Sequence, residues 1–383
     1  MARREARIAR CIIYAILLTR EDGRPRHRPS LFERFMRLFN IFKLALGLVQ
    51  PDLFKALRGI WGIVEEDYRN SFGGAVLGTG RRRRDRKRLK TKDFLQSLGD
   101  MGYSGSTFYR TRDCAYLVKS IPRHSENNFF KNTMLIPYAD HMQENPSSLL
   151  VHITDFMESR HKSIGMLFGL APSHHIVMEN ILHGKGQKME GASAELKWES
   201  WDLKPNSYFY PERDVAGGVL TSEATKSKLA DEFDGKIRLT EAQAVQFMEL
   251  LEKDTQLLAD CNAVDYSLFL VRISTAHTQD AGEASQPGEA SSTRILPMQP
   301  PFTPPDPPSW RTGVISSDGK EVYKAAVLDF FWAKHTVRAK TMTGLVKGYN
   351  LIDQQGPMSI TTDSKEYRKR FLSMCTGLVE VQI

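Results

Sequence analysis

The chain has 383 residues, of which 41% are hydrophobic and 26% are charged, a composition typical of soluble globular proteins. This composition excludes wholesale disorder, and the length allows more than one average domain but not three. No apolar run reaches the roughly 18 residues that cross a bilayer, so no transmembrane helix is expected. The 4 cysteines are widely spaced, which predicts neither a zinc site nor a disulfide framework and favours a reducing compartment.

The basic charge is concentrated near the N-terminus. Residues 1–92 hold 23 Lys and Arg against 9 Asp and Glu, whereas residues 93–383 hold 30 against 36, and the two parts sum to the net charge of +8. Most of the excess lies in one run, Arg81 to Lys92, which has nine basic residues and one acidic residue. Such a run attracts anionic lipid, nucleic acid or a nuclear-import receptor. The alternative interpretation is a solvated, disordered connector.

Residues 1–50 form a basic and partly apolar N-terminal extension. Residues 1–30 contain only one short apolar run, Cys11 to Leu18, without a cleavage pattern, and a flexible tail is expected there. A very apolar helix is expected over residues 31–49, because aromatic residues recur at helical spacing. These are Phe32, Phe35, Phe39 and Phe42. The helix either packs on the protein core or lies in a membrane interface.

From about residue 94 to residue 273, strand-like and helix-like segments alternate. The clearest helix covers residues 241–261, where Thr240 and Gln243 form a capping-box pattern. Its predicted apolar face consists of Val245, Phe247, Met248, Leu251 and Leu258. Buried strands are expected over residues 175–182, 268–273 and 322–331.

Residues 274–320 interrupt this alternation. They are rich in Ser, Thr, Gln and Gly, and positions 287–308 hold eight prolines, a composition that predicts a disordered insertion. Removing the insertion brings the strand after Asp265 next to the strand that ends at Asp329. The sequence therefore predicts these two acidic residues on neighbouring strands of one sheet.

A glycine-rich turn precedes a strand that carries one lysine. The turn runs from Gly99 to Ser106, and its glycines allow a backbone to approach a phosphate closely. The strand over residues 115–121 then places Lys119 fourteen residues after Gly105. Kinases set a cation against nucleotide phosphates with such an arrangement. A lysine at a strand edge, without this role, is the other interpretation.

Several segments together resemble the phosphatidylinositol phosphate kinase family, and in particular its phosphatidylinositol-4-phosphate 5-kinase-like members. In the family's order they are LFKALRGIWGIVEEDYRNSF, SGSTFYRTRDCAYLVKSI, HSENNFFKNTMLIPYADHMQENPSSLL, HHIVMENIL, WDLKPN, AVDYSLFLV, AAVLDFF and MSITTDSKEYRKRFLSM. The resemblance runs from about residue 52 to residue 380. The ordered set is much more specific than any single member.

The resemblance implies an α+β, two-lobed fold like that of protein kinases, with antiparallel sheets in both lobes. It implies a catalytic domain over residues 51–383 and a lipid kinase that uses ATP and Mg²⁺. The implied substrate is a phosphatidylinositol monophosphate, first of all the 4-phosphate, in an anionic membrane surface. The expected location is cytoplasmic and peripheral on membranes such as the plasma membrane, with the nucleus accessible through the basic run. A homodimer is one possible assembly.

The matched residues take their roles from the family. Lys119, Asp265 and Asp329 are implied as catalytic residues, with Asp265 near the inositol hydroxyl and Asp329 as the metal ligand. The implied nucleotide-binding residues are Gly102, Ser104, Gly105, Ser106, Lys119, Met178, Asp202 and Lys204. The implied lipid-headgroup residues lie in an activation segment over about 333–360 and are Arg338, Lys340 and Lys347.

Departures from the family's pattern leave a second interpretation open. Pro205 and Asn206 replace the Gly-Ser of the family, and proline has no amide hydrogen to donate. Asn128 stands where many members have a lysine-pairing glutamate, with Glu126 as the nearest substitute, and Ala339 replaces a usual lysine. The alternative is a catalytically weakened phosphoinositide-binding scaffold of the same fold. A specific nucleic-acid partner is not expected, because no recognised nucleic-acid module accompanies the basic run.

Overall fold

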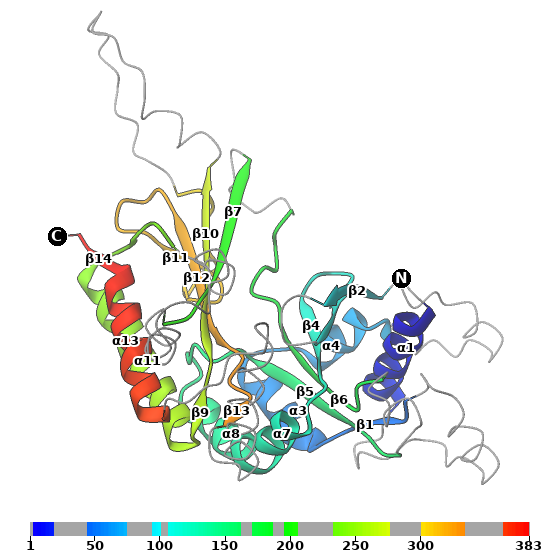
Figure 1. The fold of residues 1–383 in the computed structure, drawn as a ribbon. Coiled ribbons are helices and arrows are strands. Elements are labelled where there is room, and N and C mark those ends of the chain that lie inside the picture. The colour runs from blue at the N-terminus through cyan, green and yellow to red at the C-terminus, as the bar shows by residue number, and fades with distance from the viewer. Residues whose placement is uncertain are drawn as a thin grey trace, which may run out of the picture. The chain divides into compact units, whose positions relative to one another are not determined.

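The structure is a computed structural model (Figure 1), and it describes residues 3–18, 44–74, 94–100, 106–161, 171–186, 195–205, 233–275, 300–333 and 363–382. The chain divides into two compact units. Unit 1 comprises Met1–Pro146 and Val151–His183, and unit 2 comprises Ser147–Leu150 and Gly184–Ile383. Both units combine helices with antiparallel sheets, which confirms the predicted α+β fold.

Unit 1 is built around a six-stranded antiparallel sheet with the strand order β1-β5-β6-β4-β3-β2. Its strands are β1 (Leu46–Leu48), β2 (Leu95–Asp100), β3 (Thr107–Thr111), β4 (Tyr116–Ile121), β5 (Ile153–Ser159) and β6 (His174–Glu179). Its helices are α1 (Arg3–Leu18), α3 (Pro51–Ile60), α4 (Glu65–Ser71), α7 (His124–Phe129) and α8 (Leu135–Glu144), with the π-helical turn η2 (Phe130–Met134) between the last two. The strand expected over residues 115–121 is confirmed as β4.

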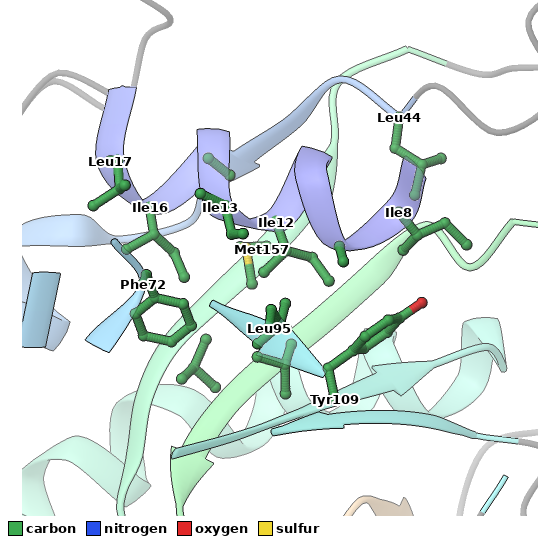
Figure 2. Close-up of a cluster of buried hydrophobic side chains, with 14 of the residues drawn as sticks. Ile8, Ile12, Ile13, Ile16, Leu17, Leu44, Phe72, Leu95, Tyr109 and Met157 are labelled. Atoms are coloured by element: carbon green, nitrogen blue, oxygen red, sulfur yellow. The ribbon is translucent and has the colours of Figure 1, made fainter. Parts of the chain in front are cut away.

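Helix α1 packs its apolar side on one face of this sheet (Figure 2). Ile8, Ile12 and Ile16 recur at helical spacing and are buried against strand residues such as Tyr109 and Met157. Burial of apolar surface contributes roughly 25 cal/mol per Å². The expectation of a flexible tail is therefore wrong for α1. An apolar run too short to cross a membrane is long enough to cover a sheet.

The predicted boundary at residue 50 does not separate two folding units. Strand β1 pairs with β5, with Leu46 opposite Ser159 and Leu48 opposite Met157, so the residues before 50 extend the central sheet of unit 1. The helix expected over residues 31–49 is wrong at its C-terminal end, where β1 forms because its backbone completes a hydrogen-bonded ladder. The rest of that prediction, residues 31–43, lies outside the described residues.

Helices α3 and α4 attach to β5 through a buried charge network. Arg58 of α3 lies 3.3 Å from the carboxylate of Asp155, and its Nη1 donates to the carbonyl oxygen of Thr154 across 2.6 Å. The hydroxyl of Tyr68 donates to Asp155 across 2.6 Å, and Glu65 accepts two hydrogen bonds from Arg58. Burial raises the pKa of Asp155 although Arg58 opposes this shift. The network therefore depends on Arg58 to keep a buried carboxylate charged.

The other face of the sheet is covered by α7, η2 and α8. The ring of Phe130 meets Phe156 of β5 edge-on, with centroids 5.4 Å apart. The hydroxyl of Tyr138 donates to the carbonyl oxygen of Val151 across 2.8 Å and accepts from the amide of Ile153 across 2.9 Å. These contacts hold α8 against the beginning of β5.

A buried histidine in this sheet gives unit 1 a pH-dependent stability. His175 of β6 lies opposite Ser120, is 0% exposed, and has no hydrogen-bond partner for either ring nitrogen among the described residues. Burial, and next the neighbouring His174, lowers the pKa of His175 from 6.5 to about 3. The unfolded chain therefore binds a proton below about pH 6.5 that the folded chain binds only near pH 3. The contribution of neutral His175 to the free energy of unfolding is therefore present above about pH 6.5 and is lost as the pH falls from there toward about pH 3.

We expect this histidine to remove on the order of 2 kcal/mol from the free energy of unfolding between pH 7 and pH 5. Urea unfolding at a series of pH values measures it. His175→Leu should flatten the pH dependence by that amount, whereas His161→Gln, at an exposed position, should leave it as in the wild type. An unchanged pH dependence in His175→Leu would contradict the assignment.

Unit 2 contains a four-stranded antiparallel sheet with the strand order β11-β12-β10-β7 and two small two-stranded sheets, β13-β9 and β14-β8. Its strands are β7 (Leu196–Leu203), β8 (Ile237–Leu239), β9 (Ala263–Val264), β10 (Ser267–Thr275), β11 (Val314–Ile315), β12 (Val322–Leu328), β13 (Trp332–Ala333) and β14 (Val379–Val381). Its helices are α11 (Glu241–Asp260) and α13 (Ser364–Leu378), which lie side by side (Figure 1).

Helix α11 matches the predicted helix closely. Thr240 accepts a hydrogen bond from the amide of Gln243, and the Gln243 side chain accepts from the Thr240 amide, which confirms the capping box. Phe247 and Leu251 are buried as expected, but Val245 is 53% exposed. Position 245 lies two residues before Phe247, on the other side of the helix, so its inclusion in the apolar face was wrong.

The proline-rich stretch is partly ordered, contrary to the disordered insertion predicted over 274–320. Strand β10 continues to Thr275, and residues 300–320 are held by buried aromatic side chains. Trp310 packs on Phe247 with ring centroids 4.2 Å apart, and its carbonyl oxygen accepts from the amide of Ala325 in β12. A few large aromatic residues outweigh the polar composition because each buries a large area. The rest of the predicted insertion, residues 276–299, lies outside the described residues.

Two nested deletions test this boundary. Replacing residues 276–299 by a short Gly-Ser linker should leave the unfolding temperature nearly unchanged, because no described contact is removed. Extending the deletion to residue 318 removes Trp310 and β11, and should lower the unfolding temperature by about 5 °C or more, since loss of a buried Trp costs roughly 3–5 kcal/mol. Equal unfolding temperatures for both deletions would contradict the ordered packing of residues 300–318.

Cys11, Cys114, Cys261 and Cys375 form no disulfide bond among the described residues. Within the described ranges, no helix has both the length and the apolar character that a membrane span requires.

Candidate functional site

Two aspartates lie where the chain passes between two sheets of unit 2. Asp265 lies between β9 and β10, and Asp329 lies between β12 and β13. Strands β10 and β12 are antiparallel neighbours, with Ser267 opposite Leu328, and β9 pairs with β13 just beyond the aspartates. The two crossings therefore run side by side, which confirms the predicted placement of both residues on neighbouring strands of one sheet.

Both aspartates have a left-handed backbone conformation. The φ angle is 66° at Asp265 and 62° at Asp329. Residues other than glycine reach this region at a cost of about 1–2 kcal/mol, and aspartate and asparagine tolerate it best. Such conformations concentrate at functional sites, where surrounding contacts hold them. Two of them at adjacent strand ends single out this edge of the sheet.

Lys204 supplies a cation to the same edge. It follows β7, which pairs with β10, and its Nζ lies 2.7 Å from Oδ1 of Asp265. Burial alone would lower the pKa of Lys204, but Asp265, and after it Asp329 and Asp202, outweigh burial and raise that pKa. Lys204 thus forms an ion pair with Asp265 and is stabilised in its charged form by the negative charges of Asp329 and Asp202.

The carboxylates fit a divalent cation together with phosphate oxygens. No three His, Cys, Asp or Glu side chains of the described ranges lie close enough to hold a metal ion by themselves. Mg²⁺ is commonly bound by one or two carboxylates, waters and the phosphates of a nucleotide. Asp265 and Asp329 provide hard oxygen donors of that kind. The arrangement is suited to a metal ion that arrives with a phosphate-bearing substrate.

Three further candidate residues belong to unit 1. Lys119 of β4 is 6% exposed, and its Nζ lies 5.5 Å from the centre of the Phe108 ring on β3. Met178 of β6 lies opposite Leu117 of β4. Ser106 is buried and directly precedes β3. These three candidates therefore gather on the adjacent strands β3, β4 and β6.

Several predicted site residues fall outside the described residues. These are Gly102, Ser104, Gly105, Arg338, Lys340 and Lys347. The basic run over 81–92 also falls outside them, as does Ala339.

The departures from the family's pattern have local partners of their own. Glu126 accepts a hydrogen bond from Arg123 across 2.8 Å, and Asn128 accepts one from the side chain of Asn132 across 2.7 Å. The π-helical turn η2 begins two residues after Asn128 and changes the helical register there. Pro205 is buried directly after Lys204.

Sequence reasoning missed two features of this site. It placed Lys204 near nucleotide phosphates but did not predict its ion pair with Asp265, because a contact between residues 61 positions apart leaves no local pattern. It also did not predict the left-handed conformations of Asp265 and Asp329. The only signal for them was an aspartate directly at the end of an apolar strand.

Comparison with known proteins places these residues in a recognised domain. The family model described as Phosphatidylinositol-4-phosphate 5-Kinase matches residues 89–378. A Phosphatidylinositol 4-phosphate 5-kinase of Plasmodium falciparum is 24% identical over 242 residues, which cover 57% of this chain and 12% of that protein. A probable phosphatidylinositol phosphate kinase of Dictyostelium discoideum is 26% identical over 228 residues, which cover 57% of this chain and 26% of that protein.

A mammalian relative aligns over a larger share of its own length. The mouse Phosphatidylinositol 4-phosphate 5-kinase-like protein 1 is 25% identical over 237 residues, which cover 62% of this chain and 50% of that protein. The chain thus spans between about an eighth and a half of the length of these relatives.

Proposed function

We propose that this chain, which belongs to the phosphatidylinositol-4-phosphate 5-kinase family, transfers the γ-phosphoryl group of ATP to an inositol-ring hydroxyl of a phosphatidylinositol monophosphate at a membrane surface. The observation that carries the proposal is the position of Asp265 and Asp329 at adjacent strand ends, with Lys204 bound to Asp265. Phosphatidylinositol 4-phosphate is the proposed substrate, and the 4,5-bisphosphate the product.

The proposed roles follow from what phosphoryl transfer requires. Positioning and charge stabilisation dominate this reaction, since the transferred group passes through a loose transition state. Asp265 would accept a hydrogen bond from the attacking hydroxyl and orient it, while Asp329 would bind Mg²⁺. When bound with ATP, Mg²⁺ neutralises charge on the phosphates. Lys204 would fix the orientation of the Asp265 carboxylate and, with Asp202, lie beside the phosphates.

The proposed nucleotide contacts of unit 1 involve Ser106, Lys119 and Met178. Lys119 is the proposed cation for the phosphates, and it lies on β4 between β3 and β6. Arg338, Lys340 and Lys347 are the proposed contacts of the lipid headgroup, and Arg81–Lys92 is the proposed second contact with anionic lipid.

Phosphate transfer to liposomes tests the proposal. The purified chain is incubated with labelled ATP, Mg²⁺ and vesicles that each carry one of the three phosphatidylinositol monophosphates. We expect labelled bisphosphate from the 4-phosphate vesicles at the highest rate, and none when Mg²⁺ is chelated. Product that is insensitive to chelation would contradict the metal-dependent mechanism.

A phosphoinositide-binding scaffold is the second candidate. The buried Pro205, at a place where the family has glycine, and the local pairing of Glu126 with Arg123 favour it. The same vesicles distinguish the two candidates. Sedimentation of the chain with vesicles, without transfer to any of the three lipids, would replace the kinase by the scaffold.

A further inference from the structure

The corner that carries Asp265 is fastened to helix α13. We propose that Tyr367 of α13 is a positioning residue for Asp265, an inference that rests on the proposed kinase activity. The hydroxyl of Tyr367 donates to the carbonyl oxygen of Tyr266 across 2.5 Å, and Tyr266 directly follows Asp265. Tyr367 is 0% exposed, so water does not compete for this hydrogen bond.

The corner needs such a contact because its backbone is strained. Asn262 and Asp265 both have positive φ angles, 59° and 66°, and such conformations persist where the surroundings determine them. The ring of Tyr266 meets Tyr367 and Phe371 edge-on, with centroids 4.7 and 4.9 Å away. Helix α13 therefore fixes both the ring and the carbonyl group of the residue after Asp265.

The same helix begins with a second contact to this corner. The hydroxyl of Ser364 donates to the carbonyl oxygen of Ala259, near the end of α11. The N-cap Asp363 accepts from the amide of Glu366 across 2.9 Å and sets the start of α13. The first turn of α13 is thus attached to the chain that leads into the Asp265 corner.

The elements before and after the segment expected to recognise the lipid both contact the Asp265 corner. Residues 334–362 lie between β13 and α13 and outside the described residues. On their N-terminal side, Trp332 of β13 pairs with Val264, the residue before Asp265. On their C-terminal side, Tyr367 binds Tyr266, the residue after it. The described elements on the two sides of these residues, β13 and α13, therefore contact the two chain neighbours of Asp265.

The variant Tyr367→Phe tests the inference, because it removes the hydroxyl group and keeps the ring. We expect kcat for transfer to lipid to fall about tenfold or more, because even a small misplacement of a reacting group slows the reaction strongly. KM for ATP and KM for lipid should stay within about twofold of the wild-type values. Loss of folded protein alone would also lower the apparent kcat without changing KM, so kcat is calculated per folded chain, with the folded fraction measured by circular dichroism.

Tyr323→Phe is the matched control in the same unit. Tyr323 of β12 is also 0% exposed, and its hydroxyl donates to the carbonyl oxygen of Lys236 and contacts Glu321. Both variants should lower the unfolding temperature by a similar amount, about 2–4 °C. Only Tyr367→Phe should lower kcat. Equal kcat values for the two variants would overturn the positioning role.

Hydrogen exchange separates failure of this inference from failure of the proposed function. Amides of residues 262–268 should exchange faster in Tyr367→Phe than in Tyr323→Phe, because local opening of the corner becomes easier. Exchange at the Tyr323→Phe rate would overturn the inference whether or not the chain is active. A wild-type chain that transfers no phosphate, with faster exchange in Tyr367→Phe, would overturn the kinase proposal but not the attachment of the Asp265 corner to α13.

Discussion

Replacing Asp329 by Asn is expected to lower kcat for phosphate transfer by at least about 10³-fold, because the substitution removes a charge that the transition state needs. Asparagine has the shape of aspartate and tolerates a positive φ angle, so the backbone conformation at 62° should survive. The loss is therefore assigned to charge rather than to folding. Steady-state transfer to vesicles with saturating ATP measures it.

The matched control for this variant is Asp260→Asn. Asp260 ends helix α11 in the same unit, is exposed, and accepts a hydrogen bond only from Gln256 among the contacts that the structure describes. The kcat of Asp260→Asn should equal that of the wild type. The unfolding temperatures of Asp260→Asn and Asp329→Asn should both stay close to that of the wild type. An Asp329→Asn chain that keeps wild-type kcat would remove Asp329 from the proposed metal site.

Replacing Arg58 by Met should destabilise unit 1 by about 3–5 kcal/mol, since it leaves the buried carboxylate of Asp155 without its main counter-charge. Methionine keeps most of the apolar stem, so packing changes little. The hydroxyl of Tyr68 then remains as a donor to Asp155. Chemical denaturation measures the free energy of unfolding, and the expected fall of the unfolding temperature is about 10 °C.

Two companion variants show whether burial of charge causes this effect. Arg58→Met combined with Asp155→Asn should recover at least about 2 kcal/mol relative to Arg58→Met alone, because the uncompensated charge is gone. Arg238→Met breaks ion pairs with Asp318 and Glu380 at a residue whose side chain is 41% exposed, and should cost less than about 1 kcal/mol. Equal losses for Arg58→Met and Arg238→Met would contradict the buried network.

The part of the fold that sequence predicted well depends on local patterns. A capping box and an apolar face predict helix α11, and continuous apolar runs predict strands β10 and β12. The position of Asp265 and Asp329 at adjacent strand ends followed from one additional step, the removal of an intervening insertion. That step succeeded because antiparallel neighbours are commonly joined by a loop of any length.

The part that sequence did not predict depends on contacts between distant residues. Nothing local shows that α1 covers a sheet, or that Arg58 meets Asp155 almost a hundred positions away. The order of residues 300–320 was not predicted, because the prediction of disorder rested on the overall composition of the segment. Composition gives one buried tryptophan, Trp310, the same weight as one serine. The matched family model begins at residue 89, yet β1 and α3 before it form part of unit 1.

The central claim is that Asp265 and Asp329 act together at one phosphoryl-transfer centre, and a double-mutant cycle tests it most directly. The kcat of Asp265→Asn, Asp329→Asn and the double variant is measured on the same vesicles. When two residues act as a unit, the losses of kcat in their single variants do not multiply in the double variant. The kcat of the double variant should therefore lie within about tenfold of the kcat of the less active single variant. Losses that multiply, or a single variant with wild-type kcat, would show that the two carboxylates do not share one reaction.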